Sequence, residues 1–356
     1  MTTLFDEITQ QPTMLAGVRK YYTSPGAIGV NALRKLVRKW PPVVVFTGMG
    51  ASLFAAYPAQ AYLSSLGIRA LVWETAELLH YHLNFLGRDT LLVVISQSGE
   101  TVEVKRLIES LPKGQPMLAV VNVEASTLAR KAAMLLPMMS GRQELVSTKT
   151  YMCSVAVLMY LAAAVAGENP RAITHALLQV IEAQEAILDR AEELIPPTVE
   201  FFNHPTYTIL MSRGPDLSSA YQGAMMLKQV VRLSAEGASA ALFRHGPIEI
   251  ISTAHRYIIF ARKNTLPSHK SSTMTGKFLL GLAEEIRSHG GRVLLFTDLP
   301  AEEAPNMRLV RVESAKLGLG TLIDSLHIQL MSHELALRAG LEPGKLWIAQ
   351  EVTSVE

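Results

Sequence analysis

Three hydroxyl groups and one amide stand close together in the stretch Ser96-Gln97-Ser98-Gly99-Glu100-Thr101. The preceding apolar run, residues 91–95, is typical of a buried parallel strand, and residues 102–108 begin an amphipathic helix. Free backbone N–H groups and the helix dipole favour an anion at such a helix start. The donors bring no fixed positive charge, so they suit the phosphate of a small metabolite. The alternative is an ordinary helix cap, although a cap needs only one such side chain.

Two other stretches combine small and polar residues in the same half of the chain. Gly48-Met49-Gly50-Ala51-Ser52 follows an apolar run at 43–46, and its small residues let backbone approach a ligand closely. It lacks the third glycine of a dinucleotide fingerprint, so a plain tight turn is the alternative. Ser147-Thr148-Lys149-Thr150 precedes a long apolar helix. It is either a helix cap or a segment that closes over a sugar phosphate.

His245 is the candidate for proton transfer. It lies in the turn Arg244-His245-Gly246-Pro247, and a histidine side chain could transfer protons at a sugar's ring oxygen or its C1 and C2 hydroxyls. The alternative is an ordinary surface histidine. His80 and His82 fall on different faces of a helix, so they do not predict a metal pair. We expect neither a metal nor a cofactor.

Two similar series of elements position these residues. Predicted strands at 43–46, 70–73, 91–95, 117–121 and 134–137 alternate with helices or loops, and the pattern restarts with strands at 207–211, 257–260 and 293–296. The main predicted helices are 53–66, 148–166, 170–194 (ending at Pro196-Pro197), 217–234, 270–289 and 319–339. The two glycine-containing turns lie roughly 165 residues apart. We therefore predict an α/β protein with two doubly wound parallel sheets, in which ligands bind at the carboxyl ends of the strands.

The predicted organisation has five parts. They are a helical leader at 1–40, a first α/β domain at 41–168, a connecting helix at 169–200, a second α/β domain at 201–340 and a tail at 341–356.

Composition excludes several classes of protein. The formal charge is +2 with 49% hydrophobic residues, which disfavours nucleic-acid binding. A single cysteine, Cys153, allows no disulfide within the chain. The amino terminus lacks the features of a signal peptide, and the longest apolar run, 155–166, is too short to span a bilayer. We expect a cytoplasmic protein that is not embedded in a membrane.

The order Gly-x-Gly-x-Ser, Ser-Gln-Ser-Gly-Glu-Thr, Ser-Thr-Lys and His-Gly-Pro resembles the sugar isomerase (SIS) family from about residue 40 to the carboxyl terminus. Within that family the chain is most similar to the isomerase half of glucosamine-6-phosphate synthases and to fructosamine-6-phosphate deglycases. Residues 352–356 also resemble the closing residues of the synthases. The resemblance implies two flavodoxin-like three-layer αβα sandwiches.

The resemblance also implies a role for individual residues. It implies a homodimer with the active site at the interface, where His245 reaches the neighbouring subunit's site and the tail closes on the sugar. The residues implied to hold the phosphate are Ser52, Ser96, Gln97, Ser98 and Thr101. Those expected to line the sugar are Gly50, Ser147, Gln229 and Gln350.

Two positions depart from the family's pattern. Gln229 matches the family's catalytic glutamate, and Gln350 matches the synthases' carboxyl-terminal lysine. A neutral amide can neither take a proton from C1 or C2 nor form a Schiff base. Glu236, Glu249 and Glu351 are the candidate replacement carboxylates.

The leading hypothesis is a phosphosugar isomerase or fructosamine-6-phosphate deglycase. Residues 1–40 are too few for a glutaminase domain, so we do not expect glutamine-derived ammonia. The alternative is a sugar-phosphate-binding protein with impaired catalysis. A sugar-phosphate-responsive transcription regulator would need a DNA-binding domain of about 70 residues ahead of the sheet, which the leader does not accommodate.

Overall fold

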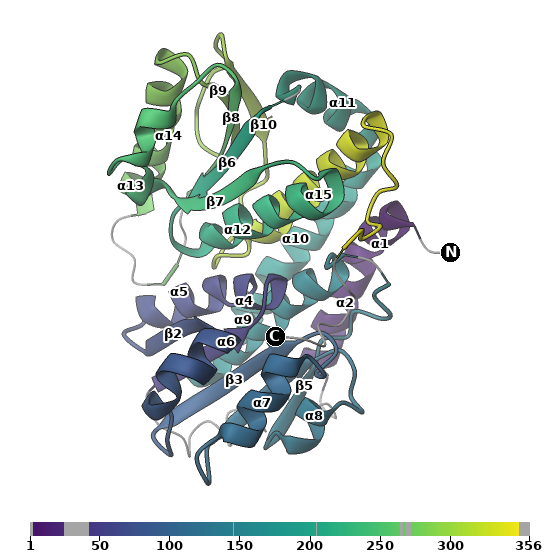
Figure 1. Ribbon diagram of the computed structural model, residues 1–356, viewed down its shortest axis with the longest axis vertical. Coiled ribbons are helices and arrows are strands. Elements are labelled where there is room, and N and C mark those ends of the chain that lie inside the picture. The colour runs from purple at the N-terminus through teal and green to yellow at the C-terminus, as the bar shows by residue number, and fades with distance from the viewer. Residues whose placement is uncertain are drawn as a thin grey trace. The chain divides into compact units, whose positions relative to one another are not determined.

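The computed structural model describes residues 3–24, 43–144, 146–203, 205–263, 266–267 and 272–348. The chain divides into two compact units, each with one five-stranded parallel sheet (Figure 1). Of the described residues, the β1–β5 unit contains those from Gln10 to Leu178 together with Trp347 and Ile348. The β6–β10 unit contains residues 3–9 and Gln179–Leu346. The boundary between the units falls inside helix α10 (Arg171–Asp189).

The first sheet has the strand order β2-β1-β3-β4-β5, and all its strands are parallel. Its strands are β1 (Val43–Gly48), β2 (Arg69–Glu74), β3 (Thr90–Ser96), β4 (Met117–Val121) and β5 (Met134–Pro137). Because β2 and β3 lie on opposite sides of β1, the order of the strands reverses there. Ligands bind at the carboxyl ends of the two strands on either side of such a reversal, here β1 and β3.

Helices of the β1–β5 unit pack on a sheet whose central strand is fully buried. On one face, Val104 and Leu107 of α7 and Leu128 of α8 pack in the same core cluster as Val94. The helices are α2 (Gln11–Thr23), α4 (Ala51–Phe54), α5 (Tyr57–Ser65), α6 (Thr75–Glu77), α7 (Val102–Ser110), α8 (Thr127–Lys131) and α9 (Lys149–Val165), with the π turn η1 (Leu78–His82) and the 3-10 turn η2 (Leu83–Phe85). The predicted single helix at 53–66 is wrong, because the chain breaks between α4 and α5.

The second sheet repeats the strand order of the first. Read from the opposite edge, it runs β7-β6-β8-β9-β10, again all parallel. The strands are β6 (Tyr207–Ser212), β7 (Ala235–Ser239), β8 (His255–Ala261), β9 (Arg292–Thr297) and β10 (Met307–Arg311). The prediction of two parallel-sheet α/β units is confirmed, whereas the edge strands β7 and β10 were not predicted.

Helices lie on both faces of this second sheet, with α14 on one side and α15 on the other (Figure 1). Leu279 and Ile286 of α14 pack with Leu295 of β9, while the neighbouring Phe296 meets His327 of α15 edge-on at 5.8 Å. The helices are α1 (Leu4–Thr9), α11 (Ala191–Phe202), α12 (Leu217–Met226), α13 (Ala240–Phe243), α14 (Ser272–Ser288) and α15 (Gly320–Arg338), with the π turn η4 (Leu227–Val231) and the 3-10 turns η3 (Gly214–Asp216) and η5 (Pro247–Ile250).

The amino-terminal helices belong to different units. Leu4 and Ile8 of α1 are buried, and the Phe5 ring lies 5.4 Å from that of His333 in α15. In the other unit, Tyr22 of α2 stacks on Tyr160 of α9 at 5.5 Å. The predicted helical leader is thus seen as α1 and α2, and its residues 25–40 lie outside the described residues.

The predicted end of the connecting helix at Pro196-Pro197 is wrong. Helix α10 ends at Asp189, and α11 contains both prolines in its interior. Proline removes helical hydrogen bonds, but α11 continues because its apolar face, including Val199 and Phe202, is buried. None of the helices in the described part of the chain has the length and hydropathy needed to cross a membrane.

Candidate functional site

The turn after β1 brings its backbone close to the end of β3. Gly48 closes β1, and a Cβ atom there would lie 2.9 Å from Ile95 O and 3.0 Å from Ser52 Cβ. Gly50 has φ +52° and directly precedes α4. Glycine meets both requirements without strain. The Gly-x-Gly-x-Ser pattern therefore places Ser52 at the same edge of the sheet as the end of β3.

The polar stretch after β3 forms a turn that its own hydroxyl groups stabilise. Ser96 Oγ accepts a hydrogen bond from Gly99 N–H at 3.0 Å, and Ser98 Oγ accepts one from Glu100 N–H at 3.2 Å. A hydroxyl that accepts through a lone pair still has its own proton to donate. Both serines are buried and Gln97 is half-buried. The turn therefore presents hydroxyl groups in a fixed arrangement at the carboxyl end of β3.

Thr101 directly precedes α7 but does not cap it. No side-chain hydrogen bond joins its hydroxyl to the helix, and among the described residues its buried Oγ1 has no hydrogen-bond partner. Buried polar atoms are nearly always hydrogen-bonded. An anion bound at this helix start would accept hydrogen bonds from the unpartnered hydroxyl and from the free backbone N–H groups.

Glu100 ties this turn to the start of α8. Its carboxylate accepts hydrogen bonds from Thr127 N–H at 2.6 Å and from Thr127 Oγ1 at 3.2 Å, and Lys105 Nζ lies 3.0 Å away. The Thr127 backbone bond, followed by Lys105, lowers the pKa of Glu100 to about 2. Glu100 is therefore ionised at neutral pH, and its charge is satisfied by these partners.

The segment before α9 is held by side chains that sequence reasoning did not single out. Gln143 Nε2 donates to Val146 O at 3.1 Å, and its Oε1 accepts from Thr150 N–H at 3.2 Å. Ser147 Oγ lies 2.8 Å from Thr150 Oγ1. Lys149 is 3% exposed, and its Nζ donates to Gln10 Oε1 and Arg142 O, both at 2.8 Å. The lysine of this motif therefore has a structural role in this arrangement.

Asn122 connects this segment to the turn after β3. Its N–H donates to Gln97 O at 3.1 Å, and its Oδ1 accepts from Ser140 Oγ at 2.7 Å. The turns after β1 and β3 and the segment leading to Ser147 thus all belong to the β1–β5 unit. The position of Asn122 directly after the buried strand β4 was the sequence signal that could have identified it.

The remaining predicted site residues lie elsewhere in the chain. His245 is exposed in the turn before η5, and Gln229 lies in the π turn η4, both in the β6–β10 unit. Gln229 Oε1 is buried and has no hydrogen-bond partner among the described residues. Gln350 and the tail residues 349–356, including Glu351, lie outside the described residues.

The two described candidate carboxylates differ in their contacts. Glu236 accepts a hydrogen bond from Tyr207 Oη at 2.6 Å, and this bond raises the pKa of Tyr207 to about 12. Glu249 is exposed in η5. No three His, Cys, Asp or Glu side chains of the described ranges are arranged to hold a metal ion.

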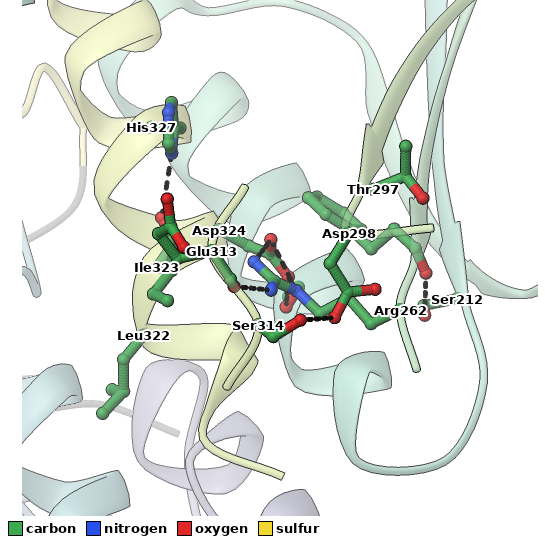
Figure 2. A network of polar contacts seen from close by, with 12 residues as sticks. Ser212, Arg262, Thr297, Asp298, Glu313, Ser314, Leu322, Ile323, Asp324 and His327 are labelled. Carbon is green, nitrogen blue, oxygen red and sulfur yellow. Dashed lines mark hydrogen bonds and ion pairs between the residues drawn. The ribbon is translucent and has the colours of Figure 1, made fainter. Parts of the chain in front are cut away.

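The carboxyl ends of β6 and β8, which correspond to those of β1 and β3, carry a buried ion pair (Figure 2). Arg262 follows β8, and its Nε lies 3.1 Å from Asp324 Oδ1 of α15. Its Nη1 donates to Glu313 O at 2.8 Å. Ser212 Oγ donates to Phe260 O at 2.7 Å, which joins the ends of the two strands directly. Internal partners therefore satisfy the polar groups at this edge.

Asp216 lies in η3, directly after β6, and is buried. Burial, followed by the nearby charge of Asp324, raises its pKa to about 8. The two matching edges therefore differ in chemistry, since one presents hydroxyl groups and the other holds paired and neutralised charges.

Comparison with known proteins agrees with this architecture. Residues 37–165 match the SIS domain family. The glutamine–fructose-6-phosphate aminotransferase (isomerizing) of Zymomonas mobilis is 27% identical over 353 residues, which cover 94% of this chain and 56% of the relative. The enzyme of the same name from Bradyrhizobium diazoefficiens is 26% identical over 351 residues. The chain spans about half the length of the curated relatives it matches.

Solved structures share the fold. The C-terminal domain of glucosamine-fructose-6-phosphate aminotransferase from Francisella tularensis has a TM-score of 0.83 at 20% identity, covering 96% of this chain and 97% of that one. Tagatose-6-phosphate ketose/aldose isomerase from Escherichia coli has a TM-score of 0.79 at 18% identity, covering 98% and 97%. The chain carries a SIS domain and is homologous to the carboxyl-terminal isomerase region of these aminotransferases.

Proposed function

We propose that the protein binds the phosphate of a phosphorylated sugar or amino sugar at the turns after β1 and β3. The observation that carries this proposal is the turn 96–101, where buried hydroxyl groups, one of them unpartnered among the described residues, stand at the start of α7. Sugar phosphates in the names of the similar proteins support this ligand class. The proposed phosphate ligands are Ser52, Ser96, Gln97, Ser98 and Thr101, and the proposed sugar-lining residues are Gly50, Ser147, Gln229 and Gln350.

The proposed activity is aldose–ketose isomerisation or hydrolysis of a fructosamine 6-phosphate to a sugar phosphate and an amine. Isomerisation moves a proton between C1 and C2, so it needs a base but no redox cofactor. His245 assists ring opening, and a carboxylate serves as the base in place of Gln229. Glu236, Glu249 and Glu351 are the candidates for that carboxylate.

The proposal includes a homodimer in the cytoplasm, in which His245 of the partner subunit completes each site. The exposure of His245 on a turn supports this assignment. When the strands of each sheet are numbered in chain order, both sheets have the order 2-1-3-4-5. This order supports a doubly wound, flavodoxin-like sandwich in each unit. Light scattering of the purified chain would test the dimer, and a monomer at micromolar concentration would exclude it.

A second candidate function is sugar-phosphate binding without turnover. It is favoured by Gln229, which stands where the family has its catalytic glutamate and which cannot take a proton as an amide. Under this hypothesis the binding turns are intact and the proton-transfer step is lost.

Turnover measurements separate the two candidates. Wild type and Gln229→Glu are assayed with fructose, tagatose and glucosamine 6-phosphates and with a fructosamine 6-phosphate, and binding is measured in parallel by calorimetry. Wild-type turnover supports the enzyme. Binding without turnover, with activity gained in Gln229→Glu, supports the binding protein. If none of these compounds binds to the wild type, or if Ser98→Ala binds them as tightly as the wild type, the phosphate site itself is wrong.

A further inference from the structure

A cavity of about 630 Å³ opens beside β10, the edge strand of the second sheet. Residues 308–313 form one wall, and the end of α10 and the first half of α11 form the other. Its volume falls in the range of about 300–1,000 Å³ that is typical of small-molecule sites. All its lining residues belong to the β6–β10 unit, so it shares none with the proposed phosphate turns.

Three arginines line the cavity, but two of them have internal partners. Arg190 Nη2 lies 2.8 Å from Glu193 Oε1. Arg311 Nη1 donates to Leu299 O at 2.7 Å, and its Nη2 donates to Ala301 O. Arg308 is different, because its buried Nε has no hydrogen-bond partner among the described residues. Because Glu193 and Glu313 also line the cavity, three cations stand beside two carboxylates, which leaves one net positive charge.

His327 also lines the cavity and brings a hydrogen-bond acceptor. It is 4% exposed, and its Nδ1 lies 3.2 Å from Ile323 O. Burial lowers its pKa to about 4, so the imidazole is neutral at physiological pH. Because a carbonyl oxygen only accepts, the proton of the ring is on Nδ1, and Nε2 is an acceptor.

We propose that this cavity is a binding site for a small organic anion that carries hydroxyl groups. The carboxylate or phosphate of the ligand pairs with Arg308, and a ligand hydroxyl donates to His327 Nε2. The hydrocarbon part of the ligand packs against Ile187 and Leu194, which also line the cavity. Glu313 belongs to the same wall, and its carbonyl oxygen accepts from Arg262. An occupant would therefore contact the segment that fixes the buried Arg262–Asp324 ion pair (Figure 2).

Calorimetric titration of the full chain with D-gluconate and with glucose 6-phosphate tests the site, with glucose as the neutral control. We expect binding of at least one anion and none of glucose. The first compound probes a carboxylate and the second a phosphate, so the pair identifies which anion is accepted. Arg308→Gln should weaken binding at this site about tenfold or more, because a charge-assisted hydrogen bond is lost.

Two further variants keep the result specific. His327→Phe keeps an aromatic ring but presents no acceptor to the cavity, so it should also weaken binding. Arg338→Gln is the matched control, since this arginine of α15 pairs with Glu334 and does not line the cavity, and its affinity should stay within about twofold of wild type. Thermal unfolding checks that each variant is folded.

This proposal is independent of the proposed phosphate site at the turns after β1 and β3. The variants can therefore refute either site without refuting the other. Binding that is lost in Ser98→Ala but unchanged in Arg308→Gln would assign the ligand to the turns and overturn this site. Absence of binding of either anion up to about 10 mM, which corresponds to less than about 3 kcal/mol of binding free energy, would also overturn it.

Discussion

At the scale of single residues, we expect the hydroxyl of Thr101 to contribute to ligand binding but not to the stability of the fold. Its buried hydroxyl has no partner within the described chain, and an unsatisfied buried polar group costs about 1–3 kcal/mol. Thr101→Val keeps the shape and removes that group. We expect an unchanged or higher melting temperature together with about tenfold or greater loss of sugar-phosphate affinity, measured by calorimetry.

Thr208→Val is the matched control for this prediction. Thr208 Oγ1 in β6 is likewise buried without a partner among the described residues, but it lies in the β6–β10 unit. Its replacement should also be tolerated and should leave affinity unchanged. Equal affinities of wild type and Thr101→Val would show that this hydroxyl does not contact the phosphate.

Glu100 predicts a specific dependence of stability on pH. Hydrogen bonds from Thr127 and the Lys105 charge lower its pKa to about 2 in the folded state, whereas an unperturbed glutamate titrates near 4.3. A lowered pKa stabilises the fold above the unfolded value and loses this effect as the pH falls. The melting temperature of wild type should therefore exceed that of Glu100→Gln at pH 6–7, and the difference should shrink between about pH 4 and pH 2. A constant difference over that range would contradict the assignment.

At the scale of elements, the conformation of Gly99 is essential to the turn after β3. Its φ is +66°, and a Cβ there would lie 2.3 Å from Ser126 Oγ. Gly99→Ala should cost about 1–3 kcal/mol from the left-handed backbone alone, with loss of sugar-phosphate binding. Gly17→Ala in α2 is the control, because a Cβ added there would have no described atom within 4 Å. It should stabilise the helix by about 0.5–1 kcal/mol. Similar melting temperatures for the two variants would exclude this role of Gly99.

The central strands of both sheets and the edge strands of the first sheet could be predicted from sequence, but the edge strands of the second sheet could not. β3 and β4 are buried on both faces, so they appear as continuous apolar runs. β7 has the sequence Ala-Glu-Gly-Ala-Ser and β10 contains two arginines. Each of these strands pairs with one neighbour only, and neither has the continuous apolar run that marks a strand buried on both faces.

The contiguous part of the candidate site could be predicted for a related reason. Residues 96–101 form one turn between a strand and a helix, so their order in sequence is also their order in space. Asn122 acts through bonds to Gln97 and Ser140, which lie in other segments of the chain. The position of Asn122 after an apolar strand could be read from the sequence, whereas its partners depend on which loops the fold brings together.

At the scale of the whole molecule, two sheets of one strand order have different chemistry at matching edges. Asp216 makes this difference measurable, because burial and Asp324 raise its pKa to about 8, whereas an unperturbed aspartate titrates near 3.9. A raised carboxyl pKa stabilises the fold at low pH and loses this effect as the pH rises toward 8. The melting temperature of Asp216→Asn, relative to wild type, should therefore increase from pH 5 to pH 8. A difference in melting temperature between the two proteins that stays constant from pH 5 to pH 8 would contradict the raised pKa.

The packing of α1 against α15 also has a consequence for how the protein is made. Phe5 lies against His333, so a helix that leaves the ribosome early packs on one that leaves it late. The apolar residues Leu4 and Ile8, buried in the finished fold, must wait until α15 has been synthesised. In the β1–β5 unit, the residues from Gln10 to Leu178 are all synthesised before α15 and do not include α1. Termination of synthesis before α15 would therefore leave α1 with its apolar face uncovered, a form that chaperones and proteases recognise.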